Sequence, residues 1–175
     1  PTFKKINVMS FSELYKSSPF GMVSSFFYGT IQSALFTLLA VYATSMNFTI
    51  LEVSIVTFLL AVSGAVAQFP VGKISDVYDR RKVIIASTFG AAIFAIITIF
   101  VSGQMYLPDG LATSKTWFYI FFILFSFCSL PMFSLILAHT NDYITKDKFV
   151  AAGAGLQFTF GLGAISGPFL CSIFM

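Results

Sequence analysis

The chain has 175 residues, of which 57% are hydrophobic and only 10% charged, and its mean hydropathy is +0.89. This composition lies outside the range of soluble globular domains. The formal net charge of +3 comes from basic residues at the ends of apolar runs. Because these residues form no contiguous basic patch, no nucleic-acid partner is indicated.

Five long segments contain no Asp, Glu, Lys or Arg: 17–51, 53–72, 83–108, 116–141 and 149–175. Each reaches the length of about 20 residues that crosses a hydrocarbon core about 30 Å thick. Buried helices of soluble proteins rarely stay free of charge over such lengths. We therefore predict an all-α, polytopic membrane helix bundle with five transmembrane helices, at about 20–46, 50–71, 82–101, 116–139 and 149–175.

Residues 1–19 precede the first predicted span and mix charged with apolar side chains. Three apolar residues share one face of a helix there: Phe11, Leu14 and Tyr15. Ser10 or Ser12 can cap that helix. We predict an amphipathic linker at the membrane surface over 1–19, followed by a partial transmembrane domain over 20–175. A frayed polar tail is an equal alternative for the first nine residues.

Cap and breaker residues mark the ends of the spans. Thr49 and Glu52 have the Thr-x-x-Glu spacing of a capping box, which predicts the start of the second span. Pro70 and Gly72 predict that this span bends or ends there. Pro131 predicts a kink inside the fourth span.

Lys and Arg residues are divided unequally between the two sides of the predicted bundle. Nine of the ten precede the first span or lie in the 72–82 and 140–148 connections, and only Lys115 lies in the alternate connections. Short loops on the cytoplasmic side of a membrane carry such an excess. We therefore predict that the N-terminus and the 72–82 and 140–148 segments are cytoplasmic.

The connection between the second and third spans holds the densest charge in the sequence, GKISDVYDRRKV from Gly72 to Val83. Its order of Gly, Ser-Asp and Arg-Arg-Lys resembles the G-x-x-[S/A]-D-x-x-G-R-[K/R] signature of the major facilitator superfamily. Asp79 stands where that signature has its second glycine. The signature joins the second and third helices of each six-helix half in these transporters, which is where it falls here.

A second motif, from Gly163 to Pro168, resembles the G-x-x-x-G-P core in the fifth helix of many drug and proton antiporters of the superfamily. Cys171 and Ser172 replace the glycine pair of its fuller form. The resemblance implies efflux coupled to protons. The spacing of Gly163 and Gly167 also predicts that the fifth span packs closely on the second span, or on the missing transporter half. Gly167 and Pro168 are expected to bend the fifth span.

Three features resemble the C-terminal half of such a transporter: the charged amphipathic start, Asp-Arg-Arg in the loop, and strings such as QFPVGKISD that are similar to the second half of bacterial facilitators. On this resemblance the five spans are the seventh to eleventh of twelve, in a bacterial inner (plasma) membrane. The chain is then expected to be part of a longer protein, with the missing N-terminal half as its partner.

The resemblance implies that the charged loop is a cytoplasmic latch between the halves, made by Gly72, Ser75, Asp76, Arg80, Arg81 and Asp142. Gly72 is expected to allow close helix approach. Asp76 is expected to face a helix N-terminus of the other half, and so to lack a complete partner within this chain. Arg80 is expected to pair with Asp142, with Arg81 and Asp76 as the competing base and acid. The alternative is a charge cluster that only fixes topology.

Polar side chains within the spans are the candidates for substrate contact: Gln32, Ser33, Thr37 and Gln157. His139, the single histidine, is a candidate proton carrier or an interfacial capping residue. No Asp, Glu, Lys or Arg lies mid-span, so a proton-coupled transporter would carry its titrating group outside this chain. Cys128 and Cys171 both fall inside predicted spans, so no disulfide framework is expected.

The predicted spans contain neither paired carboxylates nor a His cluster at one depth. The sequence therefore does not indicate an enzyme, a metal site or a cofactor. We therefore predict a secondary active transporter that moves a small molecule across the lipid bilayer by alternating access, with its site between two halves. The alternative is a non-transporting membrane partner or a degenerate transporter fragment.

Overall fold

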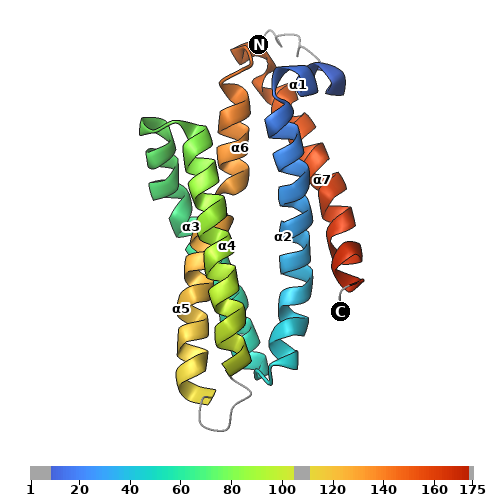
Figure 1. Cartoon of the computed structure of the whole chain (residues 1–175). Coiled ribbons are helices and arrows are strands. Elements are labelled where there is room, and N and C mark those ends of the chain that lie inside the picture. The colour runs from blue at the N-terminus through green and yellow to red at the C-terminus, as the bar shows by residue number, and fades with distance from the viewer. Residues whose placement is uncertain (1–8, 105–110, 174–175) are drawn as a thin grey trace, which may run out of the picture. The chain divides into compact units, whose positions relative to one another are not determined.

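The computed structural model describes residues 9–104 and 111–173, and these residues form helices without any strand (Figure 1). The elements are α1 (Phe11–Ser17), α2 (Pro19–Ser45), α3 (Ile50–Val77), α4 (Arg80–Gln104), α5 (Leu111–Ser129), α6 (Met132–Asn141), the 3₁₀ helix η1 (Lys146–Lys148) and α7 (Phe149–Ser172). Five segments are long and apolar enough to cross a membrane: Pro19–Ser45, Ile50–Val77, Arg80–Gly103, Lys115–Asn141 and Lys146–Ser172. The predicted all-α bundle with five spans is confirmed.

The helix caps that short sequence patterns predicted are present in the structure. The Thr49 hydroxyl accepts from the Glu52 backbone N–H at 3.3 Å, while the Glu52 carboxylate accepts from the Thr49 N–H at 2.8 Å, so the capping box is complete. Ser10 caps α1 through the Glu13 N–H. At Pro131 the fourth span is interrupted between α5 and α6, as predicted.

The second span does not end at Pro70 or Gly72, which corrects that alternative. α3 continues through both residues to Val77, where the Tyr78 backbone turns extended and its N–H bonds to the Ile74 carbonyl at 2.9 Å. A single proline removes one backbone donor, and the turns on either side keep their own bonds. Residues 72–77 of the charged segment are therefore the last turns of α3, and only Tyr78 and Asp79 connect α3 to α4.

The described chain falls into two compact units, residues 1–38 with 133–175, and residues 39–132. The first unit contains α1, the first part of α2, most of α6, and α7. The second unit contains the end of α2 together with α3, α4 and α5.

In the first unit, α2 and α7 meet backbone to backbone. A Cβ added at Gly163 would overlap the carbonyl oxygen of Phe26, and one added at Gly167 would overlap that of Thr30. In the opposite direction, Gly29 of α2 lies against the carbonyl oxygen of Phe160. The predicted close packing of the fifth span is present, but its neighbour is the first span rather than the second. We call this contact the α2–α7 seam.

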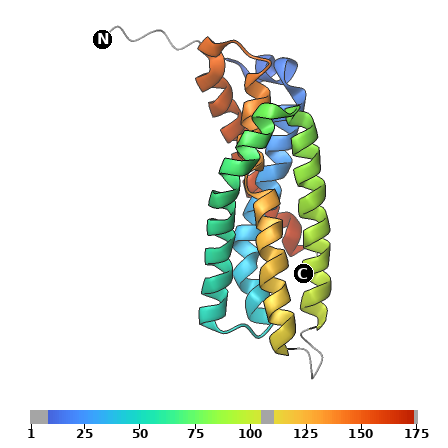
Figure 2. The ribbon, with the colours of Figure 1, turned by 90° about the vertical axis from the view of Figure 1, so that its left-hand side faces the viewer.

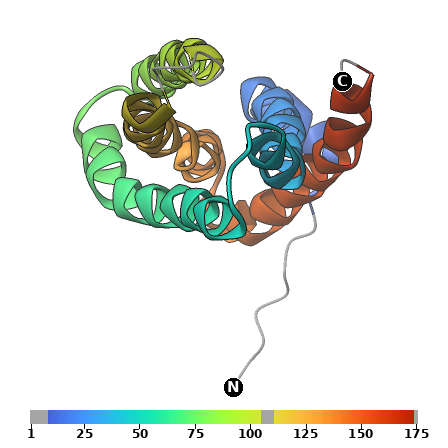
Figure 3. The ribbon, with the colours of Figure 1, turned by 90° about the horizontal axis from the view of Figure 1, so that it is seen from below.

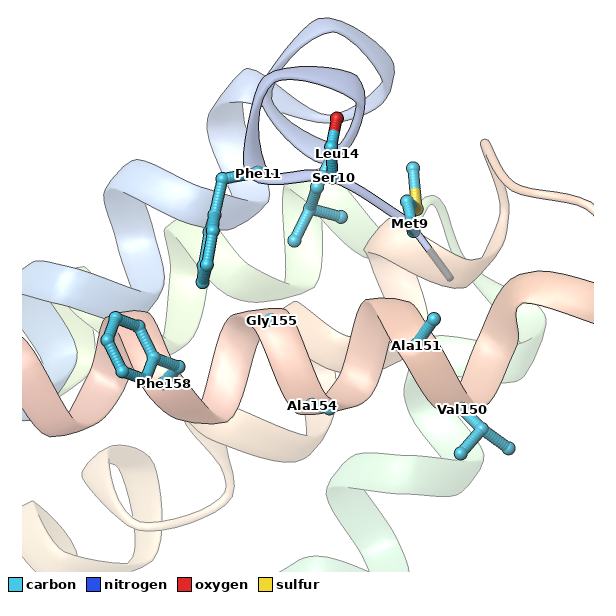
Figure 4. A pocket seen from close by; sticks show the side chains of 9 residues that line it. All are labelled: Met9, Ser10, Phe11, Leu14, Val150, Ala151, Ala154, Gly155 and Phe158. Carbon is cyan, nitrogen blue, oxygen red and sulfur yellow. The ribbon is translucent and has the colours of Figure 1, made fainter. Parts of the chain in front are cut away.

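The short helix α1 packs on the start of α7 in the same unit. Leu14 is 2% exposed and packs against Ala152 and Leu156. Figure 4 shows Phe11 and Leu14 directed at α7, with an apolar groove of about 420 Å³ between the two helices. The ring of Phe11 lies 5.2 Å from that of Phe158. The amphipathic face of α1 is thus only partly covered, because Phe11 and Tyr15 stay half exposed.

In the second unit, α5 lies between α3 and α4, as the two turned views show (Figure 2 and Figure 3). Aromatic side chains form its core: Phe118 and Phe122 are buried and stacked at 5.7 Å, and Phe48 meets Phe118 edge-on at 5.4 Å. Gly64 of α3 and Gly90 of α4 lie against the side chains of Leu130 and Cys128. This unit is therefore packed mainly through side chains.

Candidate functional site

The charged cluster predicted as a latch lies at the end of α3 and the start of α4. The Asp76 carboxylate is paired with Arg80 through one contact at 3.3 Å, the competing pairing named above, and its further partner in the other half stays a prediction. The Asp76 side chain is 71% exposed, and an exposed ion pair contributes at most about 1 kcal/mol. Ser75 is buried and donates to the Gly72 carbonyl at 2.7 Å.

Asp79 has a structural task that the sequence analysis missed. Its carboxylate accepts a hydrogen bond from the Arg81 N–H at 2.9 Å and so satisfies a free donor at the start of α4. The sequence did contain a signal for this role, because Asp79 directly precedes a helical run and capping residues favour that position. Asp79, which replaces the second glycine of the signature, thus stabilises the start of α4.

Two further parts of the predicted latch are Gly72 and the Arg80–Asp142 pair. A Cβ added at Gly72 would meet nothing within 4 Å, so the close approach expected there has no neighbour among the described residues. Arg80 and Asp142 belong to different units, and their pairing stays a prediction. Basic residues in this cluster also contact rings, since the Lys73 ammonium lies 4.5 Å from the centre of the Phe69 ring.

The four candidate substrate contacts have different surroundings. Ser33 is turned toward α7, where it lies against Gly167 and donates to the Thr30 carbonyl at 3.2 Å. Thr37 and Gln157 are exposed. Gln32 is half buried, and among the described residues its Oε1 atom is buried without a hydrogen-bond partner. Gln32 is therefore the candidate whose polar group is least satisfied by the protein itself.

Hydroxyl groups cross the α2–α7 seam, and the sequence analysis did not single them out. Ser25 donates to the Leu156 carbonyl at 2.8 Å, and Thr30 bonds to the Ser166 hydroxyl at 3.2 Å. The available signal was a stripe of small residues at helical spacing on α2: Gly21, Ser25 and Gly29. These bonds satisfy polar groups inside an otherwise apolar contact.

His139 lies in the last turn of α6 and is only 4% exposed. Its ring meets Phe20 edge-on at 5.2 Å and Tyr143 at 5.0 Å. Next to it, the buried Thr140 hydroxyl lies 3.4 Å from the Ser18 hydroxyl. The imidazole thus contacts two aromatic rings, and its role as proton carrier or cap stays a prediction.

In each unit an ion pair also joins two separate segments. In the first unit, Lys148 donates to Glu13 of α1, and this hydrogen bond holds the pKa of the Glu13 carboxyl below its usual value. In the second unit, Lys115 donates to Glu52 at 2.7 Å and lies 5.0 Å from the centre of the Phe48 ring. The single basic residue of the predicted outer side is therefore paired.

Among residues 9–104 and 111–173, no group of three or more His, Cys, Asp or Glu side chains could hold a metal ion. Cys128 and Cys171 are both free.

Comparison with known proteins identifies the group to which these helices belong. The family model of the Major Facilitator Superfamily matches residues 21–175, which include all five spans except the first two residues of the first. The chain belongs to the major facilitator superfamily. With five helices long and apolar enough to cross a membrane, it is an integral membrane protein.

Several curated relatives carry the same description. A protein named as an uncharacterised MFS-type transporter, YfkF of Bacillus subtilis, is 29% identical over 167 residues, and a like-named transporter of Yersinia enterocolitica is 24% identical over 160. Both alignments cover 91% of this superfamily chain but 39% and 38% of those relatives. The chain thus spans about two fifths of the length of the curated relatives it matches. No solved structure matches it.

Proposed function

We propose that this chain forms the seventh to eleventh helices of a secondary active transporter that moves a small molecule across a bacterial inner membrane by alternating access. The family match over all five spans carries this proposal. The relatives are long enough to contain a second half, and transporters of this kind bind substrate between two halves. The unequal distribution of Lys and Arg supports a cytoplasmic N-terminus.

The cluster of Gly72, Ser75, Asp76, Arg80 and Arg81, together with Asp142, is the proposed cytoplasmic latch. Its support is the weak Asp76–Arg80 pair, because an exposed carboxylate can exchange its partner at little cost in free energy. A helix N-terminus in the other half would offer Asp76 such a partner. The open space around Gly72 leaves room for that helix.

Gln32 is the proposed substrate contact with the strongest support, because its amide oxygen is buried and unpartnered among the described residues. Ser33, Thr37 and Gln157 complete the proposed polar lining, with Ser33 partly engaged by α7. We further propose efflux coupled to protons, supported by the glycine motif of α7. His139 stays the one candidate carrier in this chain, and other titrating groups would belong to the missing half.

Transport by the full-length protein in proteoliposomes tests this proposal. The protein is assayed against a panel of small molecules with and without a proton gradient, beside a Gln32→Leu variant and the control Thr44→Val on the same helix. We expect gradient-dependent transport, and a raised KM in Gln32→Leu alone. Failure of every compound would favour the non-transporting partner or degenerate fragment, and equal KM values in the two variants would remove Gln32 from the site.

A further inference from the structure

A second apolar groove, in the second unit, begins where α3 ends and α4 starts, and it extends to the middle of the fourth span. It has a volume of about 410 Å³ and is formed by the end of α3, the start of α4 and the end of α5. Val71 and Val83 are buried in its floor, and Cys128 is half buried beside them. The volume falls within the range of small-molecule sites, and the floor suits a hydrocarbon chain.

The rim of this groove is polar and basic. Tyr78 and Lys82 both line it and are both exposed. α3 ends at Val77 and α4 begins at Arg80, so these two side chains lie at the level where spans leave the hydrocarbon. Tyr and Lys at that level place an apolar stem in the bilayer and a polar tip among the headgroups.

Lys82 differs from the other basic residues of the segment. Arg80 is paired with Asp76, and the Lys73 ammonium lies over the Phe69 ring. For Lys82, no hydrogen bond or ion pair occurs with any of the described residues. The 72–82 segment carries four basic and two acidic residues, so the field at the rim is positive. A membrane phosphate is the anion that such a field attracts at this level.

The geometry points to a binding site for an anionic phospholipid, with one acyl chain in the groove and the phosphate at Lys82 and the Tyr78 hydroxyl. This inference uses only the membrane spans and is independent of the proposed transport activity. The groove between α1 and α7 provides a comparison, because its volume of about 420 Å³ is similar but its lining has no charged side chain. The groove between α1 and α7 therefore has no charged side chain in its lining that would select an anionic headgroup.

The test is photolabelling of the full-length protein in proteoliposomes with phosphatidylglycerol that carries a diazirine on an acyl chain. Labelled peptides are located by mass spectrometry. We expect label on the peptides that contain Val83 and Cys128. Lys82→Gln should reduce this label about fivefold, the loss expected for one Lys at a membrane surface, and Lys82→Arg should keep it. Ala86→Trp, which fills the groove without changing charge, should also reduce it.

The matched control is Lys146→Gln, an exposed lysine of the first unit, which should leave the label unchanged. Three outcomes would overturn the proposal. The first is unchanged labelling in both Lys82→Gln and Ala86→Trp. The second is equal labelling by a phosphatidylcholine probe, which would mean that the groove does not select an anionic headgroup. The third is loss of label on adding millimolar inorganic phosphate, which would identify a free anion as the occupant.

Discussion

The glycines of the α2–α7 seam and those of the second unit have different neighbours. Along the α2–α7 seam of the first unit, Gly29, Gly163 and Gly167 each face a backbone carbonyl of the opposite helix. In the second unit, Gly64 and Gly90 face the side chains of Leu130 and Cys128. A side chain can change its rotamer or be shortened by mutation, whereas a backbone carbonyl moves only with its helix. Glycine therefore fixes the distance between the helices in the α2–α7 seam, whereas its contacts in the second unit can adjust through the opposing side chains.

This difference has a physical origin in the membrane. Without a hydrophobic driving force between helices, close packing and hydrogen bonds hold them together, and small residues allow the closest approach. The seam has both, because Ser25 and Thr30 bond across it. We expect α2 and α7 to behave as one body over residues 21–38 and 149–167, and we expect added side-chain volume to cost less stability in the second unit than in the seam.

The largest effect is expected from Gly163→Leu. The new side chain would have to enter the backbone of α2 at Phe26 and Thr30, so we expect destabilisation above about 4 kcal/mol and loss of folded protein from the membrane. Gly161→Leu is the matched control on the same helix, because an added Cβ there meets nothing within 4 Å. Size-exclusion profiles of both variants in detergent check this, and a well-folded Gly163→Leu protein would refute the seam.

An intermediate effect is expected from Gly64→Ala. The new methyl group would lie 2.6 Å from the Leu130 Cβ, which a rotamer change cannot move. Overpacking of this size costs about 1–3 kcal/mol. Thermal unfolding in detergent should show a lowered Tm. Leu130→Gly removes the crowding side chain but also its packing, so the double variant should lose less stability than the two single variants lose together. Losses that add fully would show that Gly64 and Leu130 do not crowd each other.

A smaller effect is expected from Gly90→Ala. Its new methyl group would lie 3.1 Å from the Cys128 sulfur, so a shift of a few tenths of an ångström suffices. The gain in helix propensity, up to about 1 kcal/mol, offsets much of that strain. We expect a Tm change within about 2 °C, and an increase once Cys128→Ala removes the sulfur. A drop as large as that of Gly64→Ala would contradict the side-chain account of this unit.

The smallest effect is local and concerns α1. The pKa of Glu13 is held below its usual value of about 4.3 by the hydrogen bond from Lys148, so the ion pair is complete above that value and is lost as the pH falls through the lowered pKa. We expect Glu13→Gln to raise hydrogen exchange in α1 at neutral pH, without changing exchange in α4. Lys146→Gln is the control. Unchanged exchange in α1 would mean that Leu14 alone holds this helix.

The spans, the capping box and the break at Pro131 could be predicted because each follows from chemistry within a few residues. The extension of α3 past Pro70 could not, since one missing donor is a small loss for a long helix. The partner of α7 was mispredicted because glycine spacing indicates a close contact but does not say with which helix. The stripe of small residues on α2 that ends at Gly29 is the other side of this contact, but the sequence does not show that the two stripes meet. Asp79 was missed because the family signature directed attention to its missing glycine.

The α2–α7 contact can be tested directly by a disulfide. In full-length protein with Cys128 and Cys171 replaced by Ser, Thr30→Cys and Ser166→Cys bring two thiols to positions whose hydroxyls now lie 3.2 Å apart. Oxidation in native membranes should form the cross-link rapidly, and a protease site introduced between the helices should leave both fragments joined until the disulfide is reduced. Combining Ser166→Cys with Val62→Cys of α3 tests the neighbour that the glycine spacing first suggested. Efficient cross-linking to α3, with none to Thr30→Cys, would contradict the account.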